Sequence, residues 1–290
     1  MRTPKEINAL IRLLDDPDED IFGHIKNELK SFGADVIPEL ESHWEKNRLG
    51  ILFQSRVENL IHEIQYGSLE ENLLFWWESD KPDLLEGVTL VSNYKYPELT
   101  TDEINQRISI YTQEIWLEIN DYLTALEKIK LINHFIFDVH GFTGNVAGFH
   151  DHQNSFLKDV LESKKGNPLS LSILYILIGR QLDLPIYGVN LPRHFVVAYL
   201  DPYQLTTPIE DSPVLFYINP FSNGDVFGPE ELSQFLEKID VPEKEEYFKP
   251  CDSKVMLTRL LNNLIYSYNK KGELQKSQEI KRLLLLLNKR

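Results

Sequence analysis

The feature that most constrains the fold is a mostly apolar segment between Asn167-Pro168 and Leu184-Pro185. Asn is a favoured helix N-cap, and Pro suits the first helical position because its missing N–H and fixed φ cost nothing there. The residues that follow, 169–178, are almost all apolar, which is typical of a helix buried on every side. The sequence therefore predicts a central buried helix from Pro168 to about Leu182.

Short segments rich in β-branched and aromatic residues follow this helix. They are bounded by Pro, Asp or Gly and predict three antiparallel strands, at Ile186–Leu191, Phe195–Leu200 and Val214–Ile218. A further helix is predicted from Gly228 to Ile239. Helices followed by a small antiparallel sheet indicate an α+β fold.

Helical periodicity dominates the rest of the chain. Apolar residues recur at helical spacing through residues 1–66 and through most of 67–153. The last forty or so residues predict a pair of helices joined at Gly272. We therefore expect a mostly helical α+β protein in three parts, residues 1–66, 67–250 and 251–290.

Composition restricts the possible partners and the compartment. The formal net charge of −15 argues against general affinity for nucleic acid or for anionic membrane surfaces, since both need basic patches. A single cysteine, Cys251, excludes an intrachain disulfide framework and fits a reducing compartment. The N-terminus lacks the apolar run of a signal peptide, and no apolar run is long enough to span a bilayer. A cytoplasmic protein of undetermined oligomeric state is expected.

Five motifs, agreeing in order, resemble the SirB-type branch of the transglutaminase-like superfamily. They are Gly141-Phe142-x-Gly144-Asn145, Asn154-Ser155-x-Leu157-x-x-Val160-Leu161, Gly166-x-Pro168-Leu169-Ser170-Leu171, Gly188-Val189-x-Leu191-Pro192-x-His194-Phe195 and Ile218-Asn219-Pro220-Phe221. The resemblance covers about residues 67–290 and implies a papain/transglutaminase-like core. Residues 1–66 resemble HEAT-type helical repeats instead, and residues 251–290 resemble half of a tetratricopeptide repeat.

The resemblance implies a catalytic frame from which the nucleophile is missing. Enzymes of this kind place a Cys at a helix N-terminus, where the helix dipole lowers the pKa of the thiol, and pair it with a His and an Asp or Asn. His194 and Asn219 match the last two positions, but the nucleophile position falls on Pro168. Arg193 stands where the branch has Gly, and strand alternation would send it to the face opposite His194.

Two functional hypotheses follow. The first is a non-catalytic transglutaminase-like protein that binds a peptide or protein partner, with the helical flanks as docking elements. The alternative is an amide or ester hydrolase or acyltransferase with Ser172 or Ser170 as nucleophile, His194 as base and Asn219 as orienting group. Serines on such an apolar helix more often bond to backbone carbonyls.

Other chemistry has less support from the sequence. Cys251 follows His194 in the chain, the reverse of the family order. Imidazole and carboxylate groups that suit a transition metal gather in one polar segment, at His140, His150, Asp151 and His152, but their spacing matches no closed metal site, so no metal is assigned. The chain has no glycine-rich phosphate loop, so no cofactor is expected.

Overall fold

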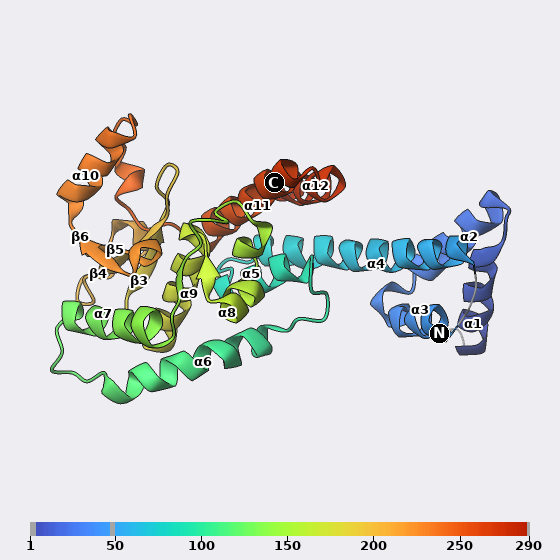
Figure 1. Ribbon diagram of the computed structural model, residues 1–290, viewed down its shortest axis with the longest axis horizontal. Helices are drawn as coiled ribbons and strands as arrows, with labels where there is room; N and C mark the ends of the chain where they lie inside the picture. Colours follow the sequence, from blue (N-terminus) through green and yellow to red (C-terminus); the bar gives the residue numbers. More distant parts are fainter. Residues whose placement is uncertain (1–3, 47–49, 289–290) are drawn as a thin grey trace. The chain divides into compact units, whose positions relative to one another are not determined.

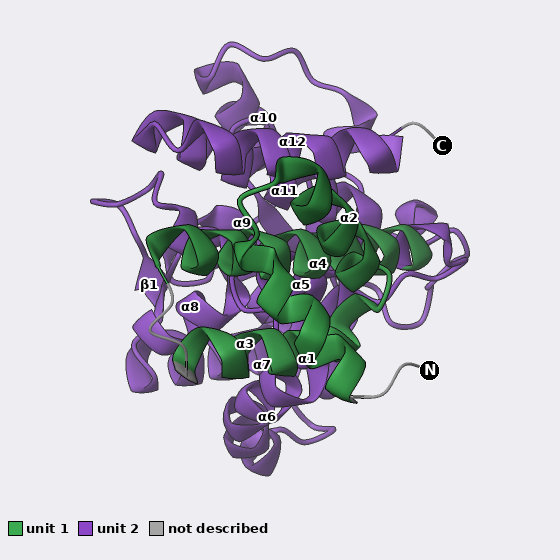
Figure 2. Cartoon of the chain, turned by 90° about the vertical axis from the view of Figure 1, so that its right-hand side faces the viewer, with its two compact units in different colours: residues 1–75 green, residues 76–290 purple. Residues whose placement is uncertain are grey.

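The chain forms two compact units, Met1–Phe75 and Trp76–Arg290 (Figure 2). The computed structural model describes residues 4–46 and 50–288. Each unit has a hydrophobic core of its own. The candidate functional residues all belong to the second unit.

Helices make up the first unit. They are α1 (Pro4–Arg12), α2 (Glu19–Lys30), α3 (Ile37–Lys46) and the first part of α4 (Ile51–Glu78). Asp18 caps α2 by accepting from the Asp20 and Ile21 backbone N–H groups. Buried Arg56 donates to the Leu14 and Asp16 carbonyls, so it ties α4 to the turn before α2.

The helix α4 is longer than the sequence predicts. The helical spacing of apolar residues in this region predicts a helix from Phe53 to Ile64, but α4 continues through Gly67 to Glu78. A glycine inside a helix costs about 1 kcal/mol relative to alanine, which flanking helical turns offset. A single interior glycine was therefore a poor signal for a helix end.

Eight further helices lie in the part of the second unit that the structure describes. They are α5 (Leu84–Asn93), α6 (Thr101–Glu118), α7 (Ala125–Asn133), α8 (Leu157–Ser163), α9 (Pro168–Gln181), α10 (Pro229–Lys238), α11 (Ser253–Lys271) and α12 (Leu274–Asn288). The predicted central helix is confirmed by α9, in which residues 168–179 are all buried. After α7 the chain widens into a π-helical turn, His134–Val139, within the region for which the sequence predicts ordinary helical spacing.

The main sheet is antiparallel, in the order β3-β4-β5-β6. Its strands are β3 (Ile186–Val189), β4 (Val196–Leu200), β5 (Val214–Asn219) and β6 (Asp225–Phe227). The three predicted strands are confirmed, whereas β6 is too short to give an alternating pattern. The helix α9 packs against β3 and β4, and α10 covers a buried cluster of the same sheet (Figure 1). The mostly helical α+β fold is therefore confirmed.

Two smaller features complete the core. A short parallel pair joins β1 (Thr143–Gly144) to β2 (Lys165–Gly166) just before α9, and the sequence did not predict it. The helices α11 and α12 form the predicted pair and lie side by side (Figure 1). Gly272 joins them with a φ of +77°, a left-handed conformation that favours glycine. Among the described residues, no helix combines the length and apolar character needed to cross a membrane.

Candidate functional site

The N-terminus of α9 is capped inside the protein rather than by solvent. The Asn167 side chain accepts from the Ser170 backbone N–H at 2.9 Å, and the Asn167 backbone N–H donates to Ser170 Oγ at 3.0 Å. The Asn167 amide also donates to Ser155 Oγ at 3.2 Å. These bonds fix Pro168 as the first helical residue, as the sequence predicts.

Both candidate serines have structural hydrogen bonds. The Ser170 hydroxyl belongs to the cap and donates to the Asn167 carbonyl at 3.2 Å. Ser172 Oγ, which is fully buried, donates to the Phe195 carbonyl at 3.5 Å. Within the described residues neither serine hydrogen-bonds to His194. Their roles match the backbone bonding that is common for serine in helices.

The structure brings His194 and Asn219 together, as the sequence predicts. His194 Nε2 and Asn219 Oδ1 lie 3.1 Å apart, and the Asn219 amide nitrogen donates to Ser222 Oγ at 3.1 Å. The second bond orients the Asn219 oxygen towards the ring, so Nε2 is the donor and Nδ1 is left as the basic nitrogen. Asn219 ends β5, but His194 lies in the turn before β4 rather than on a strand.

A partly buried network sets the position of Asn219. Tyr175 of α9 donates to Asn133 Oδ1 at 2.8 Å, and Asn133 Nδ2 donates to the Gly224 carbonyl at 2.7 Å. The Gly224 N–H donates in turn to the Asn219 carbonyl at 2.9 Å. Gly224 has a φ of +78°, and a Cβ there would lie 2.1 Å from Asn133 Oδ1, so only glycine fits.

Aromatic rings enclose the His194 imidazole. Its centroid lies 6.2 Å from that of Phe221 and 5.8 Å from that of Phe235. Burial lowers the pKa of His194 below its ordinary value of 6.5, the Asn219 bond raises it in part, and the Arg259 charge lowers it further. The ring is therefore neutral at pH 7, the form that can accept a proton.

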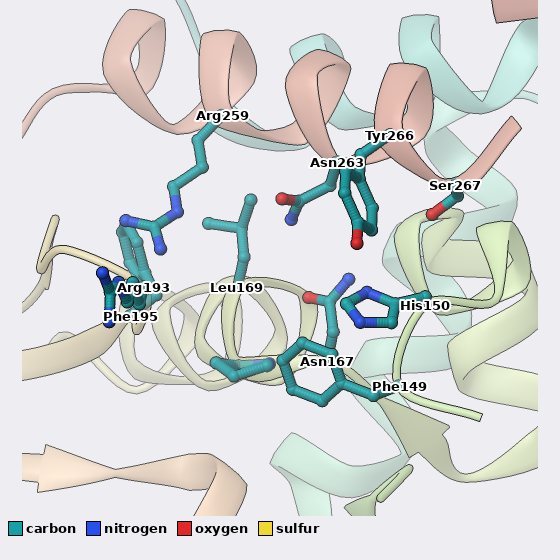
Figure 3. Close-up of a pocket in the computed structure, with 11 residues that line it drawn as sticks. Phe149, His150, Asn167, Leu169, Arg193, Phe195, Arg259, Asn263, Tyr266 and Ser267 are labelled. Atoms are coloured by element: carbon teal, nitrogen blue, oxygen red, sulfur yellow. The ribbon is translucent and has the colours of Figure 1, made fainter. Parts of the chain in front are cut away.

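A cavity of about 160 Å³ opens at the N-terminus of α9 (Figure 3). Side chains from α9, from α11, from the loop before α8 and from the turn before β4 converge on it. The lining residues are Phe149, His150, Asn167, Pro168, Leu169, Arg193, Phe195, Arg259, Asn263, Tyr266 and Ser267. His194 is not one of them, because its ring turns towards Asn219.

Asn154 holds the loop that supplies one wall of this cavity. Its buried side-chain amide donates to the Gly148 and Phe149 carbonyls at 2.7 and 3.2 Å. The Asn145 amide donates to Asn154 Oδ1 at 2.9 Å. His150 is thereby placed with its ring centroid 4.8 Å from that of Tyr266 on α11.

Arg193 has a left-handed backbone, with a φ of +61°. Arg193 faces the cavity and His194 faces Asn219, so the two side chains point apart as predicted. Strand alternation is the wrong reason, because the segment is a turn and not a strand. The left-handed region favours glycine, which the resembling branch has at this position. The arginine therefore carries a conformational cost and places a cation in the cavity wall.

The histidines considered as metal ligands have separate partners. His140 Nε2 lies 2.8 Å from Glu114 Oε2, whereas the His152 ring stacks on Tyr268. His150 faces the cavity, and Asp151 pairs with Lys271 at 3.2 Å. In the described part of the chain no three metal-binding side chains come together.

Cys251 lies outside this cavity. It is half-buried and lines a different cavity of about 460 Å³, together with several carboxylates. Burial, with the charge of Asp252, raises the pKa of the Cys251 thiol to about 12. A thiol with this pKa is a poor nucleophile near neutral pH.

Sequence reasoning missed most of the cavity. Arg259, Asn263 and Tyr266 come from α11. The sequence predicts this helix as half of a C-terminal pair that serves as a docking flank, and it singles out none of the three residues. No sequence signal distinguishes them, since polar residues on an amphipathic helix normally face solvent. Only the fold shows that one face of α11 meets the start of α9.

We expect the free energy of unfolding to fall as the pH is lowered from 7 through 6.5. Because the folded pKa of His194 lies below the unfolded value of 6.5, the unfolded chain takes up protons first. The loss amounts to about 1.4 kcal/mol for each unit by which the pKa is lowered. Urea unfolding from pH 7 to 5 should show a shallower dependence in His194→Gln. An unchanged slope would contradict the assignment.

Arg193→Gly is expected to stabilise the protein by roughly 0.5–1 kcal/mol. A non-glycine residue in the left-handed region destabilises the folded state by roughly 1–2 kcal/mol. Glycine removes this cost, but its greater freedom in the unfolded chain offsets roughly 0.5–1 kcal/mol of the gain. The matched control is Arg180→Gly in the last turn of α9, which should destabilise by about 1 kcal/mol. Thermal unfolding of both variants and of wild type measures these changes. A melting temperature of Arg193→Gly below that of wild type would show that Arg193 is not strained.

Comparison with known proteins places the chain in a family. The sequence family described as the transglutaminase-like superfamily matches residues 102–262. A UPF0162 protein of Xylella fastidiosa is 26% identical over 208 residues, which are 68% of this chain and 70% of that protein. A UPF0162 protein of Vibrio cholerae is 24% identical over 157 residues, 54% of each chain.

A relative with a different name shares the same region. F-box only protein 21 of mouse is 27% identical over 157 residues, which cover 54% of this chain and 24% of that protein. No solved structure matches the chain. The family match includes α9, His194, Asn219 and Arg259, and it spans more than half of the chain. The chain therefore belongs to the transglutaminase-like superfamily.

Proposed function

We propose that this chain is a non-catalytic, SirB-type member of its superfamily that binds a segment of a peptide or protein partner in the cavity at the start of α9. The observation that carries the proposal is the position of Pro168. It lines the cavity at the first helical position, where the resemblance expects the nucleophile, and a proline side chain has no nucleophilic chemistry.

The surrounding chemistry agrees with binding rather than turnover. His194 and Asn219 keep the geometry of a base and its orienting group, but no serine or cysteine in the described residues hydrogen-bonds to the imidazole. A general base needs its nucleophile within hydrogen-bond reach. The serine-hydrolase alternative therefore has no supporting observation.

The polar groups of the cavity suit a peptide ligand. Asn263 and Tyr266 make no side-chain hydrogen bond within the described residues, and Tyr266 is exposed. Such groups can pair with the N–H and C=O groups of an extended segment, which must be satisfied when they leave water. The HEAT-like and tetratricopeptide-like flanks are proposed to supply further docking surface.

A selection of displayed random peptides on the full chain tests the binding function. We expect wild type to enrich a common motif, and Asn263→Trp to lose it, because the indole fills the cavity. Asn262→Trp is the matched control, since Asn262 is the neighbouring, exposed residue of α11 and lies outside the lining. If no motif emerges, or if Asn263→Trp retains it, peptide binding in this cavity is wrong.

A restored thiol tests the missing-nucleophile interpretation. In Pro168→Cys, the helix dipole should depress the pKa of the new thiol, so iodoacetamide should alkylate it faster than Cys251, whose pKa is raised to about 12. Rates against pH, with mass-spectrometric assignment of the modified residue, give both pKa values. Alkylation no faster than at Cys251 would contradict the geometry.

Activity assays test the same interpretation from the other side. Wild type should hydrolyse neither amide nor ester substrates, and Ser170→Ala and Ser172→Ala should alter stability alone. Hydrolysis by wild type that disappears in Ser172→Ala would overturn the non-catalytic proposal.

A further inference from the structure

We infer that the cavity at the start of α9 is a carboxylate-binding site, with the Arg259 guanidinium as its anchor, Arg193 as a second cation, and an apolar residue bearing a free carboxylate as its ligand. This inference rests on the proposed peptide-binding function and names the chemical group that the cavity selects.

Arg259 has donors that the protein leaves unused. Its Nη1 donates to Asn190 Oδ1 and to the Leu191 carbonyl, which fixes the guanidinium beside the Phe195 ring, 5.7 Å from the centroid. The N–H groups on Nη2 and Nε have no acceptor, and no carboxylate pairs with this arginine, within the described residues. A guanidinium held on one side and open on the other presents the fork that binds a carboxylate through two hydrogen bonds.

A second cation lies at the same end of the cavity. Figure 3 shows Arg259 extending from α11 towards the side where Arg193 and Phe195 lie. Arg193 forms no ion pair with any described residue, and its left-handed backbone places it there at a conformational cost. Residues with such strained backbones cluster at active sites and ligand-binding sites.

The charge of the lining is opposite to that of the chain. The net charge of the protein is −15, yet the residues that line this cavity include two arginines and no carboxylate. The cavity beside Cys251 shows the opposite case, since it contains Glu210, Glu245, Glu246 and Asp252 with a single lysine. Arg259 is half-buried and Arg193 is exposed, and neither guanidinium has an ion pair among the described residues. Both lie near the N-terminus of α9 and attract an anion, and the helix dipole adds to that attraction.

The size and apolar walls of the cavity select the rest of the ligand. A volume of about 160 Å³ is smaller than the roughly 300–1,000 Å³ of pockets that enclose drug-sized ligands, so it accepts one residue. Phe149, Leu169 and Phe195 supply apolar surface beside the guanidinium groups. An apolar residue with a free C-terminal carboxylate fits both features, whereas a free phosphate leaves the apolar walls uncovered.

Two probes that differ only in charge test the inference. N-acetyl-leucine carries a carboxylate, and N-acetyl-leucinamide is its neutral counterpart. Titrated into the full chain at low salt and followed by NMR, the acid should bind wild type at least tenfold tighter than the amide, because charge-assisted hydrogen bonds are about twice as strong as neutral ones. Raising the salt should reduce the preference.

The variants assign that preference to the two arginines. Arg193→Gly, which removes strain and should not unfold the chain, is expected to weaken binding of the acid several-fold and leave the amide unchanged. Arg259→Lys retains the charge but loses the planar fork, and should weaken the acid about tenfold. Lys238→Gln, at an exposed position of α10 outside the cavity, is the control for net charge and should change neither probe.

Equal binding of acid and amide, or binding of neither, would overturn the carboxylate site. Inorganic phosphate that displaces N-acetyl-leucine better than acetate does would also overturn it, since the site would then be a phosphate site. The peptide selection separates this failure from that of the proposed function. If the selected peptides share a motif that depends on the cavity but needs no carboxylate, peptide binding stands and the carboxylate site is wrong. If N-acetyl-leucine binds but no peptide motif emerges, the carboxylate site stands and peptide binding is wrong.

Discussion

Burial of α9 is the constraint on which the rest of the second unit depends. A helix with residues 168–179 all buried cannot satisfy the donors of its first turn with water, so the protein must supply the acceptors. Asn167 and Ser170 do this reciprocally, and Pro168 lowers the demand because it has no N–H to satisfy. Pro168 therefore also favours a helix start inside the protein.

The same burial accounts for the two-sided character of the site. On one side, Tyr175 of α9 hydrogen-bonds to Asn133, which hydrogen-bonds to the turn that holds Asn219 beside His194. On the other side, the start of α9 meets α11 and forms a cavity with arginines in its wall. The imidazole and the cavity are separate environments, one neutral and aromatic, the other cationic and open.

Local patterns were sufficient for the sequence to predict α9, its cap, three strands and the pairing of His194 with Asn219. The helix, its cap and the strands depend on residue types close together in the chain, and the His194–Asn219 pairing was expected from the family resemblance. The cavity depends instead on which face of α11 meets α9, and periodicity leaves that open, so Arg259 could not be predicted. The conformation of Arg193 was also hidden, because an arginine before His194 on a predicted strand gives no indication of a positive φ.

The Tyr175–Asn133–Gly224 network also affects the order of folding. Its two hydrogen bonds join residues 42 and 91 positions apart in the chain. Contacts of such separation pay their loop-closure entropy before they contribute stability, so they form late, whereas α7 and α9 can begin from local contacts. The orientation of Asn219 towards His194 is thus expected to form late in folding. We therefore expect the helices of the second unit to form before the His194–Asn219 pair takes its native geometry.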